Sequence, residues 1–470
     1  MAQSAMSWAQ EEFGASRLGD ERRVRRLVQL AADATRRPSG TVAGTFKGGS
    51  RREAAFRLVE NDGVDPVALA AASHCATAQR CAPERTVIVP IDTTALSLRD
   101  PTGARGFGPI GARYQETSGI FAMTALAVRA DGETLGVLAQ RWWVRSRKRT
   151  RRRRMSSKQD PRPREARESF HWVRCLRDAD SHLRTHAPTC RAWYQIDRAG
   201  DCLPVLAAAV DEGFLVTTRA QYNRRLARGG YLHTSIVRQP VAGYYEFDVP
   251  ERPHQQPRRA RLAVRFFRTQ LSLPLKKDCR RTVWMNLVYA KEIGAPPGQK
   301  PLKWMLLTNA VVETLADALR VVEAYTFRWR VEEFHKTWKS GACGIESSLL
   351  RAPDHLIRWA TVMAAVAARI ERIKHRSREQ PDLPASVEYS QDEIDATILL
   401  RKNETRVTHK PGDVPTLGEV TRWIADLGGY MGSKKSPPPG SVVLRRGLEQ
   451  VAAAAVVIRI MRDGGDQRSG

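Results

Sequence analysis

The side chains best suited to chemistry gather in residues 325–339, whose letters are YTFRWRVEEFHKTWK. On a helix that turns about 100° per residue, four of them fall within roughly 60° of one another: Tyr325, Arg328, Glu332 and Lys339. Lys336 joins this face, whereas Glu333 points about 100° away from it. One face therefore carries a phenol, a guanidinium, a carboxylate and two ammonium groups. A solvated amphipathic helix also collects charge on one side, so spacing alone leaves both interpretations open.

Two aspartates follow strand patterns and could join Glu332. Residues 86–93 (TVIVPIDT) predict a buried strand that ends in Asp92, and residues 192–196 predict a second that ends at Asp197. If the two strands are neighbours and the helix packs across them, the three carboxylates converge. Phosphoryl transfer on DNA uses two divalent ions about 3.5–4 Å apart, and oxygen ligands suit Mg²⁺ or Mn²⁺. The sequence has no H-E-x-x-H pattern and no Walker A loop, so we expect neither zinc nor a nucleotide cofactor.

The elements that must position these residues follow a recognisable order. Strand patterns at 86–93, 119–129 and 134–145 precede a helix at 164–184, a strand at 192–196, a helix at 202–210 and a strand at 213–218. With the later Glu332 helix, this order predicts an α/β multidomain protein with a ribonuclease-H-like core. Residues 220–308 alternate with period two, which predicts an antiparallel β insertion before the last helix.

The N-terminal part of the chain, at 1–70, is predicted to be helical. Apolar spacing marks a helix at 4–13, and Asp20 can cap another at 21–35 with Arg22, Arg23 and Arg26 opposite its apolar side. A second basic cluster at 47–52, which includes Lys47 and Arg51, opens a further helix. Such clusters suit phosphate contacts, although a solvated basic surface has the same composition.

The C-terminal part predicts a core helix at 349–374, a polar linker at 375–412, and helices at 415–427 and 447–461. The last helix has an apolar seam formed by four residues: Leu448, Val451, Ala455 and Ile458. From the pattern, this seam could pack inside the domain or against a second subunit. We divide the chain into domains at 1–70, 71–376 and 377–470.

Composition indicates the class of partner. The net charge of +27 favours a polyanion, most commonly nucleic acid. An anionic membrane is the rival, but no apolar run approaches the ~18 residues that a span needs. The start of the chain lacks a signal-peptide pattern, and the seven scattered cysteines suggest reduced thiols in the cytoplasm. The basic block RKRTRRRR at 147–154 predicts an exposed loop with a loose DNA contact rather than a localisation signal.

The pattern Y-x2-R-x3-E-x6-K at 325–339 resembles the signature of the IS-four family of DDE transposases, in particular the cut-and-paste Tn-five type. IDTT at 91–94 resembles the first aspartate motif of this family, and IDRAGD at 196–201 resembles the second. LGDERR and GSRREAAFR resemble its N-terminal DNA-binding domain. At the second motif, Ala199 and Gly200 replace the usual Glu-Ala, a departure that leaves Asp197 in place.

The resemblance implies roles for particular residues. It makes Asp92, Asp197 and Glu332 the ligands of two Mg²⁺ ions, for which Mn²⁺ may substitute. It assigns phosphate contacts to four residues of the signature: Tyr325, Arg328, Lys336 and Lys339. Arg219 follows Asp197 at the spacing of a family arginine that grips phosphate near the scissile bond. Trp304 precedes Tyr325 at the spacing of a tryptophan that lines a flipped-base pocket.

The resemblance also implies a reaction and partners. Water attacks the transposon end, the freed 3′-hydroxyl forms a hairpin, a second water opens it, and the 3′-end joins target DNA. The partners are double-stranded DNA, as terminal inverted repeats and as target, and a second copy of the chain, which favours the subunit interpretation of the C-terminal seam. We expect a bacterial, cytoplasmic, nucleoid-associated enzyme with no membrane partner.

Two other functions remain open. A transposase-derived repressor would bind DNA without catalysis, and it would usually show a lost carboxylate or a broken signature. A structure-selective nuclease with the same core would need neither the N-terminal domain nor the β insertion.

Overall fold

The computed structural model describes residues 4–111, 117–146, 167–249, 257–276, 279–402, 408–432 and 438–466. The basic block at 147–154 lies outside these residues, so its expected DNA contact is not addressed by the structure. Among the helices of the described residues, none combines the length and the apolar character that crossing a membrane requires.

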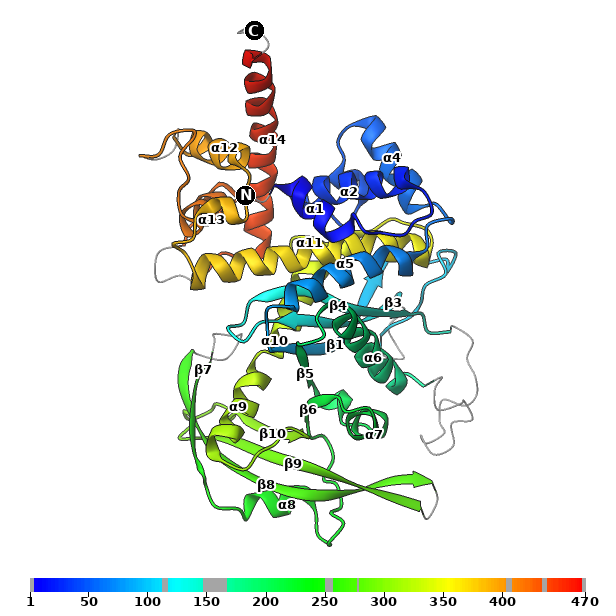
Figure 1. Cartoon of the computed structure of the whole chain (residues 1–470), viewed down its shortest axis with the longest axis vertical. Coiled ribbons are helices and arrows are strands. Elements are labelled where there is room, and N and C mark those ends of the chain that lie inside the picture. The colour runs from blue at the N-terminus through cyan, green and yellow to red at the C-terminus, as the bar shows by residue number, and fades with distance from the viewer. Residues whose placement is uncertain are drawn as a thin grey trace.

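Five strands form the centre of the molecule (Figure 1). They are β1 (Thr86–Leu98), β3 (Ser118–Val128), β4 (Thr134–Trp143), β5 (Arg191–Ile196) and β6 (Leu215–Arg219). β3 pairs antiparallel with both β1 and β4, whereas β5 runs parallel to β1 and to β6. The predicted order of three strands, a helix, a strand, a helix and a strand is confirmed, and most of the strand ends lie close to their predicted positions.

Helices cover both faces of this sheet because the strands alternate their apolar side chains. Val87, Val89 and Ile91 face the helices α6 (Ser169–His186) and α7 (Leu203–Asp211), whereas Ile88 faces the opposite core. That second core contains α10 (Trp329–Lys339) and α11 (Pro353–Glu379). The helix that carries Glu332 therefore packs on the face of β1 opposite to α6, which is the arrangement that convergence with the aspartates requires.

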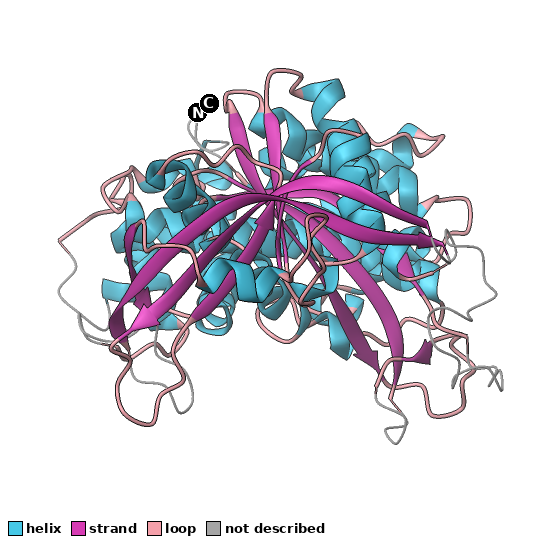
Figure 2. Ribbon diagram, turned by 90° about the horizontal axis from the view of Figure 1, so that it is seen from below, coloured by secondary structure: helices cyan, strands magenta, loops and turns pink. Residues whose placement is uncertain are grey.

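The insertion is antiparallel, as predicted, but it is not a separate subdomain. Its elements are α8 (Leu232–Val237), β7 (Gly243–Val249), β8 (Arg258–Lys276), β9 (Cys279–Ile293) and β10 (Lys303–Thr308). Because β10 pairs with β6, the insertion continues the central sheet in the order β2-β3-β1-β5-β6-β10-β9-β8-β7, with β4 beside β3 and β2 at Gly108–Pro109. Figure 2 shows these strands as one twisted sheet.

The N-terminal residues form helices, as predicted. The elements are α1 (Ala5–Phe13), α2 (Glu21–Arg36), α3 (Val42–Thr45), α4 (Gly49–Val59) and α5 (Pro66–Cys81). Asp20 caps α2 by accepting a hydrogen bond from the backbone N–H of Arg22. These helices share one apolar core with α10 and α11, and α5 runs across our boundary at residue 70. The N-terminal helices are therefore packed on α10 and α11.

The prediction of a polar linker at 375–412 is wrong. This stretch contains the end of α11, at Glu379, and the whole of α12 (Gln391–Lys402), and it contributes buried residues to a core that includes Tyr389, Ile394 and Ile398. The stretch is polar although it is folded, because some of its charges form ion pairs inside the protein. Glu388 is fully buried and pairs with Arg372. A hydropathy pattern does not distinguish the residues of a buried ion pair from charged residues on the surface.

The last helix, α14 (Ser441–Asp466), is longer than the expected 447–461 and follows α13 (Leu417–Leu427). The predicted seam packs inside its own domain: Val451 and Ala455 are buried with α12 and α13, and Leu448 and Ile458 pack partly against the same core. The interpretation of these four residues as a subunit seam is therefore wrong.

Candidate active site

Asp92 and Asp197 occupy neighbouring positions on parallel strands. Ile91 pairs with Ile196, so the residues that follow each of them lie side by side across β1 and β5. Asp197 directly follows β5, as predicted, and accepts a hydrogen bond of 2.8 Å from the backbone N–H of Ala199. Asp92, in contrast, lies inside β1 rather than at its end. The strand continues to Leu98 because β3 pairs with it on its other edge.

The signature stretch is not one continuous helix. Tyr325 lies in the last turn of α9 (Leu315–Thr326), and a turn at residues 327 and 328 separates it from α10. The backbone N–H of Arg328 donates to the carbonyl of Tyr325 at 3.1 Å, which tightens the chain there. Arg328 nevertheless keeps right-handed helical angles, with φ −55° and ψ −29°, so the two helices follow each other closely.

Arg328 and Glu332 form an ion pair along the start of α10. Arg328 Nη2 and Glu332 Oε1 are 2.5 Å apart, and the side chain of Arg328 is buried while that of Glu332 is about one third exposed. The guanidinium carbon of Arg328 also lies 4.6 Å from the centre of the Trp329 ring. The arginine is thus held by a carboxylate and an aromatic ring, and Glu332 is the more exposed partner.

These charged groups lie close enough together to shift one another's pKa values. Burial, and then the neighbouring Asp197, raise the pKa of Asp92 to about 7, and Glu332 adds to this while Arg328 opposes it. Burial raises the pKa of Tyr325 to about 12, so its phenol is neutral at physiological pH and can donate a hydrogen bond. The pKa of Asp92 is therefore raised because Arg328 does not balance the effects of burial and of the neighbouring carboxylates.

The donor set suits a hard divalent cation, because closely placed carboxylates with a raised pKa are stabilised by added positive charge. As the side chains are arranged, no three His, Cys, Asp or Glu residues in the described part of the chain stand close enough to hold a metal. Asp92 and Asp197 are adjacent, while Glu332 is turned toward Arg328. The three residues are therefore of the chemical type that binds such a cation, but Glu332 is paired with Arg328 and does not join the two aspartates in this conformation.

Arg219 lies close to the same charged groups. It is the last residue of β6, and its Nη2 donates to the carbonyl of Lys303 at 2.7 Å. Burial lowers its pKa, and Tyr325, Arg328 and Asp197 are among the groups that act on it electrostatically. The position is consistent with the predicted phosphate contact beside Asp197.

Trp304 is a core residue of β10. Its ring makes edge-on contacts with Phe247, at 5.1 Å between centroids, and with Tyr325, at 6.3 Å. Only 5% of Trp304 is exposed, and Met305 packs on the opposite face of the strand. A base could reach this indole only after one of the neighbouring rings moves, so the predicted pocket is closed in this conformation.

The two signature lysines differ in their surroundings. Lys336 is exposed on α10. Lys339 Nζ lies 3.6 Å from Glu346, which also accepts a hydrogen bond of 2.8 Å from the backbone N–H of Ser97 in β1. Lys339 is therefore tethered to the strand that carries Asp92, whereas Lys336 is available to a ligand.

The predicted N-terminal contacts lie in α2, in α4 and in the turn between α3 and α4, and Figure 1 shows these elements at the end of the molecule opposite the insertion. Arg22, Arg26 and Lys47 are exposed, and Arg51 lies 3.7 Å from Asp33. Arg23 has a structural role, because its Nη1 donates to the carbonyls of residues 18 and 63 at 3.0 and 2.8 Å.

One polar group beside the site was missed by sequence reasoning. Thr124 stands directly opposite Asp92 on β3, and its hydroxyl lies 3.3 Å from His335 Nε2 and 3.1 Å from Gln140 Nε2. Burial, followed by Lys339, lowers the pKa of His335 to about 3, so this ring is neutral. The signal was present, since His335 follows Glu332 at helical spacing on the same element, and it ties α10 to the strand next to Asp92.

Asp201, the last residue of the IDRAGD motif, is also structural. Its carboxylate accepts from Arg224 Nε and from the backbone N–H of Gln221, both at 2.8 Å. It is almost fully buried, so it anchors the start of the insertion rather than contacting a substrate.

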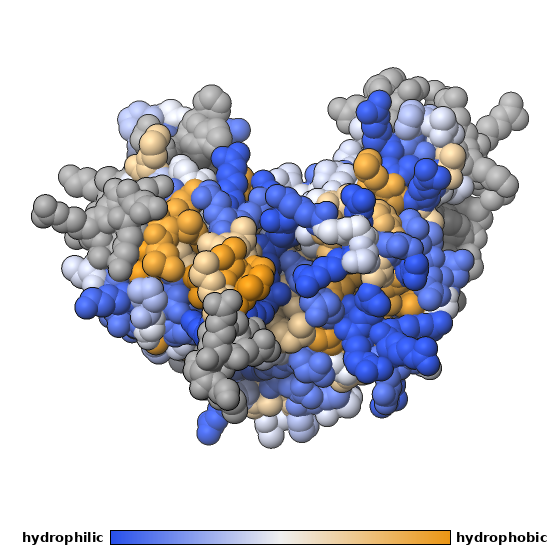
Figure 3. All heavy atoms as spheres, turned by 90° about the horizontal axis from the view of Figure 1, so that it is seen from above, coloured by the Kyte–Doolittle hydropathy of each residue, from blue (hydrophilic) through white to orange (hydrophobic). Residues whose placement is uncertain are grey.

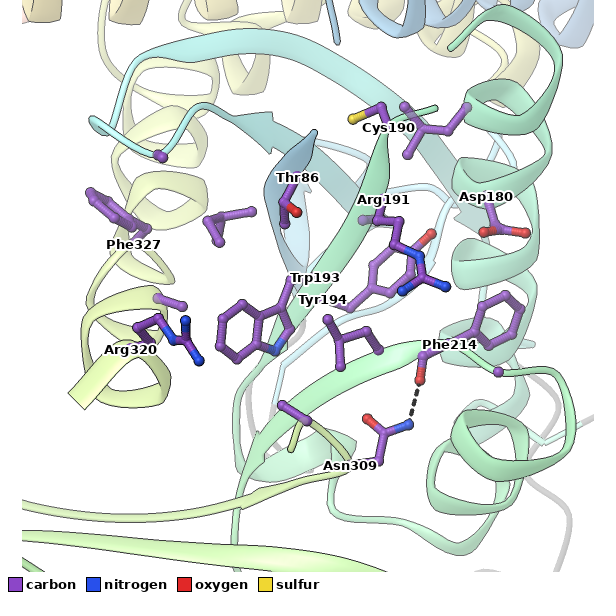
Figure 4. Close-up of a pocket in the computed structure, with 18 of the residues that line it drawn as sticks. Thr86, Asp180, Cys190, Arg191, Trp193, Tyr194, Phe214, Asn309, Arg320 and Phe327 are labelled. Carbon is purple, nitrogen blue, oxygen red and sulfur yellow. Dashed lines mark hydrogen bonds between the residues drawn. The ribbon is translucent and has the colours of Figure 1, made fainter. Parts of the chain in front are cut away.

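A cavity of about 920 Å³ lies elsewhere, at the amino ends of β1, β5 and β6 (Figure 4). Trp193 and Phe327 project into it from the sheet and from the turn after α9, and Arg320 lies at its side. The carboxylates stand at the opposite ends of these strands, so this cavity is not the candidate active site.

Comparisons with family models agree with this layout. Residues 5–64 match the family model Transposase DNA-binding, residues 145–368 match Transposase DDE domain, and residues 365–466 match Transposase Tn5 dimerisation domain. The DDE match begins after Asp92 and includes Asp197 and Glu332. Among solved structures, the chain is similar to a piggyBac transposase synaptic complex with hairpin DNA, with a TM-score of 0.39 and 9% identity over 80% of this chain and 76% of that chain.

Proposed function

The chain belongs to the Tn5-type DDE transposases, and on this premise we propose that it excises a DNA element by metal-dependent cleavage at both ends and joins it to a target. The observation that carries the proposal is the register of β1 and β5, which sets Asp92 beside Asp197 beneath the helix of Glu332. Because Asp92 already has a raised pKa, the site is arranged to receive positive charge.

Asp92, Asp197 and Glu332 would hold the divalent ions, which supply Lewis acidity to the attacking and the leaving oxygen of the phosphoryl transfer. For Glu332 to take part, its carboxylate leaves Arg328, whose guanidinium then becomes free to bind a phosphate of the DNA. Arg219, fixed to the carbonyl of residue 303, would bind a phosphate on the other side of Asp197. The neutral phenol of Tyr325 and the ammonium groups of Lys336 and Lys339 complete the backbone contacts.

In the proposed sequence, a water oxygen attacks the phosphorus at the transposon end, and the 3′-oxygen leaves as a hydroxyl. That hydroxyl attacks the opposite strand, which closes a hairpin and frees the flanking DNA. A second water opens the hairpin, and the regenerated 3′-hydroxyl attacks a phosphorus of the target. Each step exchanges one P–O bond for another, so one set of phosphate-holding residues serves all of them.

We also propose that α14 forms the contact between two copies of the chain. The predicted seam is used internally, but four other apolar residues toward the end of this helix are about half or more exposed: Val456, Val457, Ile460 and Met461. Figure 3 looks onto the end of the molecule from which α14 projects, and apolar side chains gather on that face. These residues lie in the matched dimerisation region, so a second copy is the occupant we propose.

The test is cleavage of a duplex that carries the element's own inverted repeats, with and without Mg²⁺, followed by gel analysis. Mg²⁺-dependent nicking, hairpin and strand-transfer products are expected. Specific binding with no product would favour the repressor, and cleavage without regard to the inverted repeats would favour a structure-selective nuclease.

The flipped-base role of Trp304 needs its own test, because the ring is buried. We propose that a base extruded during hairpin formation stacks on it, which returns roughly 1–3 kcal/mol. Trp304→Ala should then reduce hairpin products about 10–100-fold while nicking persists, since nicking needs no extrusion. Equal loss of both products with a lowered melting temperature would assign Trp304 to the core alone.

A further inference from the structure

Among the residues that the structure describes, exposed aromatic rings are confined to the insertion. In the described part of the chain, the Phe, Tyr and Trp side chains that stay exposed all lie between residues 222 and 284: Tyr222, Tyr231, Tyr244 and Trp284. A guanidinium carbon lies over three of these rings, at 5.3 Å for Arg224 on Tyr222, 4.0 Å for Arg261 on Tyr244 and 4.8 Å for Arg268 on Trp284. Aromatic rings interleaved with arginines are typical of surfaces that bind nucleic acid.

The charge of the insertion is also exceptional. Residues 220–308 contain 17 Lys and Arg and 5 Asp and Glu, so less than a fifth of the chain carries +12 of the net charge of +27. Charge complementarity therefore indicates a polyanion as the occupant of any open surface here.

The distal half of the β8–β9 hairpin has one bare face. We call it the Trp284 face, and it consists of Arg268, Gln270, Ser272, Arg280, Thr282 and Trp284. Trp284 is 46% exposed at its centre, opposite Gln270 in the register. The reverse face is sealed, since Leu271 and Val283 are buried in a core with α7 and α8. Among these residues there is no acid, so the face is uniformly polar, aromatic and basic.

The two arginines of this face are held in place before any ligand binds. Arg280 donates from Nε to the hydroxyl of Ser272 at 2.5 Å and from Nη2 to its carbonyl at 2.6 Å. Arg268 is held against the Trp284 ring. A fixed guanidinium loses little entropy on binding phosphate, which favours a docking role over a freely solvated one.

The register locates this face relative to the active site. Asn286 pairs with Thr308, Thr308 with Thr217, and Thr217 with Gln195, so these four side chains share one face of the sheet. Asp197 lies two residues beyond Gln195, and Trp284 lies two residues before Asn286. Four residues along the strands and three strands across correspond to roughly 20 Å, or about six base pairs of duplex. In Figure 1 the N-terminal helices lie at the other end of the molecule, beyond the site.

We propose that the Trp284 face docks the target duplex, without regard to its sequence, when the transposon end occupies the active site. This inference rests on the proposed function. The N-terminal helices account for the transposon end, so the distal face is left for DNA on the far side of the reacting phosphorus. On the exposed face of the ribbon, the register places Trp284 between Arg268 and Arg280, so that both guanidinium groups can contact phosphates of a duplex that lies along this face.

The experiment compares the full-length protein with Trp284→Ala and with the double variant Arg268→Ala/Arg280→Ala. Arg281→Ala is the matched control, because this neighbouring arginine pairs with Asp211 on the other side of the ribbon. Pre-cleaved transposon ends are assembled with each variant. Strand transfer into a plasmid of unrelated sequence is then measured, beside Mg²⁺-dependent cleavage of a short end duplex with minimal flank.

Strand transfer should fall about 10-fold or more for the alanine variants, since the double variant loses phosphate contacts and Trp284→Ala removes the ring that holds Arg268 in place, while short-end cleavage stays within twofold of the control. The salt dependence of target capture should become shallower by nearly two in slope for the double variant. Normal strand transfer overturns the proposal. So does a cleavage defect seen only with long flanks, which would assign the face to donor DNA. If the parent protein cleaves no ends at all, the proposed function fails, and the binding of unrelated duplex by the end-free protein still reports on this face.

Discussion

Two clusters of charged side chains in this molecule are built from the same residue types and behave in opposite ways. In the candidate active site, burial and Asp197 raise the pKa of Asp92, because the carboxylates are close together and Arg328 does not compensate for them. At the start of the C-terminal region, burial would raise the pKa of Glu388 in the same way, but Arg372, Arg369 and Arg376 outweigh it and the pKa is lowered.

The geometry explains the difference. Glu388 is fully buried, and Arg372 binds both of its oxygens, at 2.8 and 3.0 Å, while Arg376 lies 3.2 Å away. Both oxygens of this carboxylate have donors within the chain. Asp92 has a backbone donor, Thr93, at 2.7 Å, and otherwise faces acids and one shared arginine. The direction of the pKa shift thus distinguishes a carboxylate that is paired with arginines inside the fold from one that is crowded by other carboxylates.

The largest effect is expected at the unsatisfied cluster. Asp92→Asn, Asp197→Asn and Glu332→Gln should each lower Mg²⁺-dependent cleavage by about 10³-fold or more, equivalent to about 4 kcal/mol in the barrier. End binding, measured by gel shift, should stay nearly unchanged. Removing the Asp92 charge also removes repulsion, so the melting temperature of Asp92→Asn should be equal to or above that of the parent.

Glu333→Gln is the control for this prediction. Glu333 is exposed and pairs with Arg330 at 3.0 Å, away from the aspartates, so substantial activity should remain. An inactive Glu333→Gln beside an active Glu332→Gln would mean that the wrong carboxylate has been placed in the site.

The satisfied cluster should respond in the opposite sense. Glu388→Gln leaves three arginines around a neutral group, and breaking a buried pair in this way costs about 3–5 kcal/mol. Urea unfolding should show the loss, and the cleavage rate per folded molecule at low temperature should not change. If Glu388→Gln were as stable as the parent but inactive, the contrast between the two clusters would collapse.

A pH series sharpens the same contrast. A carboxyl with a lowered pKa in the folded chain contributes its full stability above the unfolded pKa of about 4.3, and loses it as pH falls toward the folded pKa. The difference in unfolding free energy between the parent and Glu388→Gln should therefore be constant above about pH 6 and shrink on acidification. A difference that grows toward low pH would show that Glu388 is not held ionised by its arginines.

The smallest effect extends the comparison to basic side chains. Arg22 and Arg26 are exposed, whereas Arg23 donates to two carbonyls. Arg22→Ala and Arg26→Ala should each make the salt dependence of end binding shallower by about 0.9 in slope if each arginine contacts one phosphate. Arg23→Ala should instead lower the melting temperature and leave the slope alone. Titrations between about 50 and 200 mM salt distinguish the two outcomes.

The core sheet could be predicted because its strands are local and strongly apolar. TVIVPIDT and the run before Asp197 each specify a buried strand, and both strands are present. The helix carrying Glu332 was predicted from the spacing of its polar residues, and the structure shows that its buried residues also recur at helical spacing.

The remainder depended on partners that are distant in sequence. Nothing near Asp92 reveals that β3 prolongs β1 to Leu98, and nothing in residues 220–308 reveals that β10 pairs with β6. The spacing of the seam residues in α14 predicted an apolar stripe, but it did not identify the elements that cover this stripe. Glu388 resembled solvated surface because its arginines come from another element, the preceding helix α11. The turn at Arg328 interrupts a helix whose composition gives no warning of a break.

The pairing of β10 with β6 makes the insertion a continuation of the central sheet. If residues 220–308 were deleted, β6 would become an open edge with unpaired backbone groups, which invites aggregation rather than a smaller enzyme. Lengthening the β8–β9 hairpin at its free end is different, because pairs of residues added there leave the inner register untouched. The pairing of β10 with β6 thus fixes the insertion where it joins the central sheet, whereas the β8–β9 hairpin can change in length. Such a change would not disturb Asp92 and Asp197.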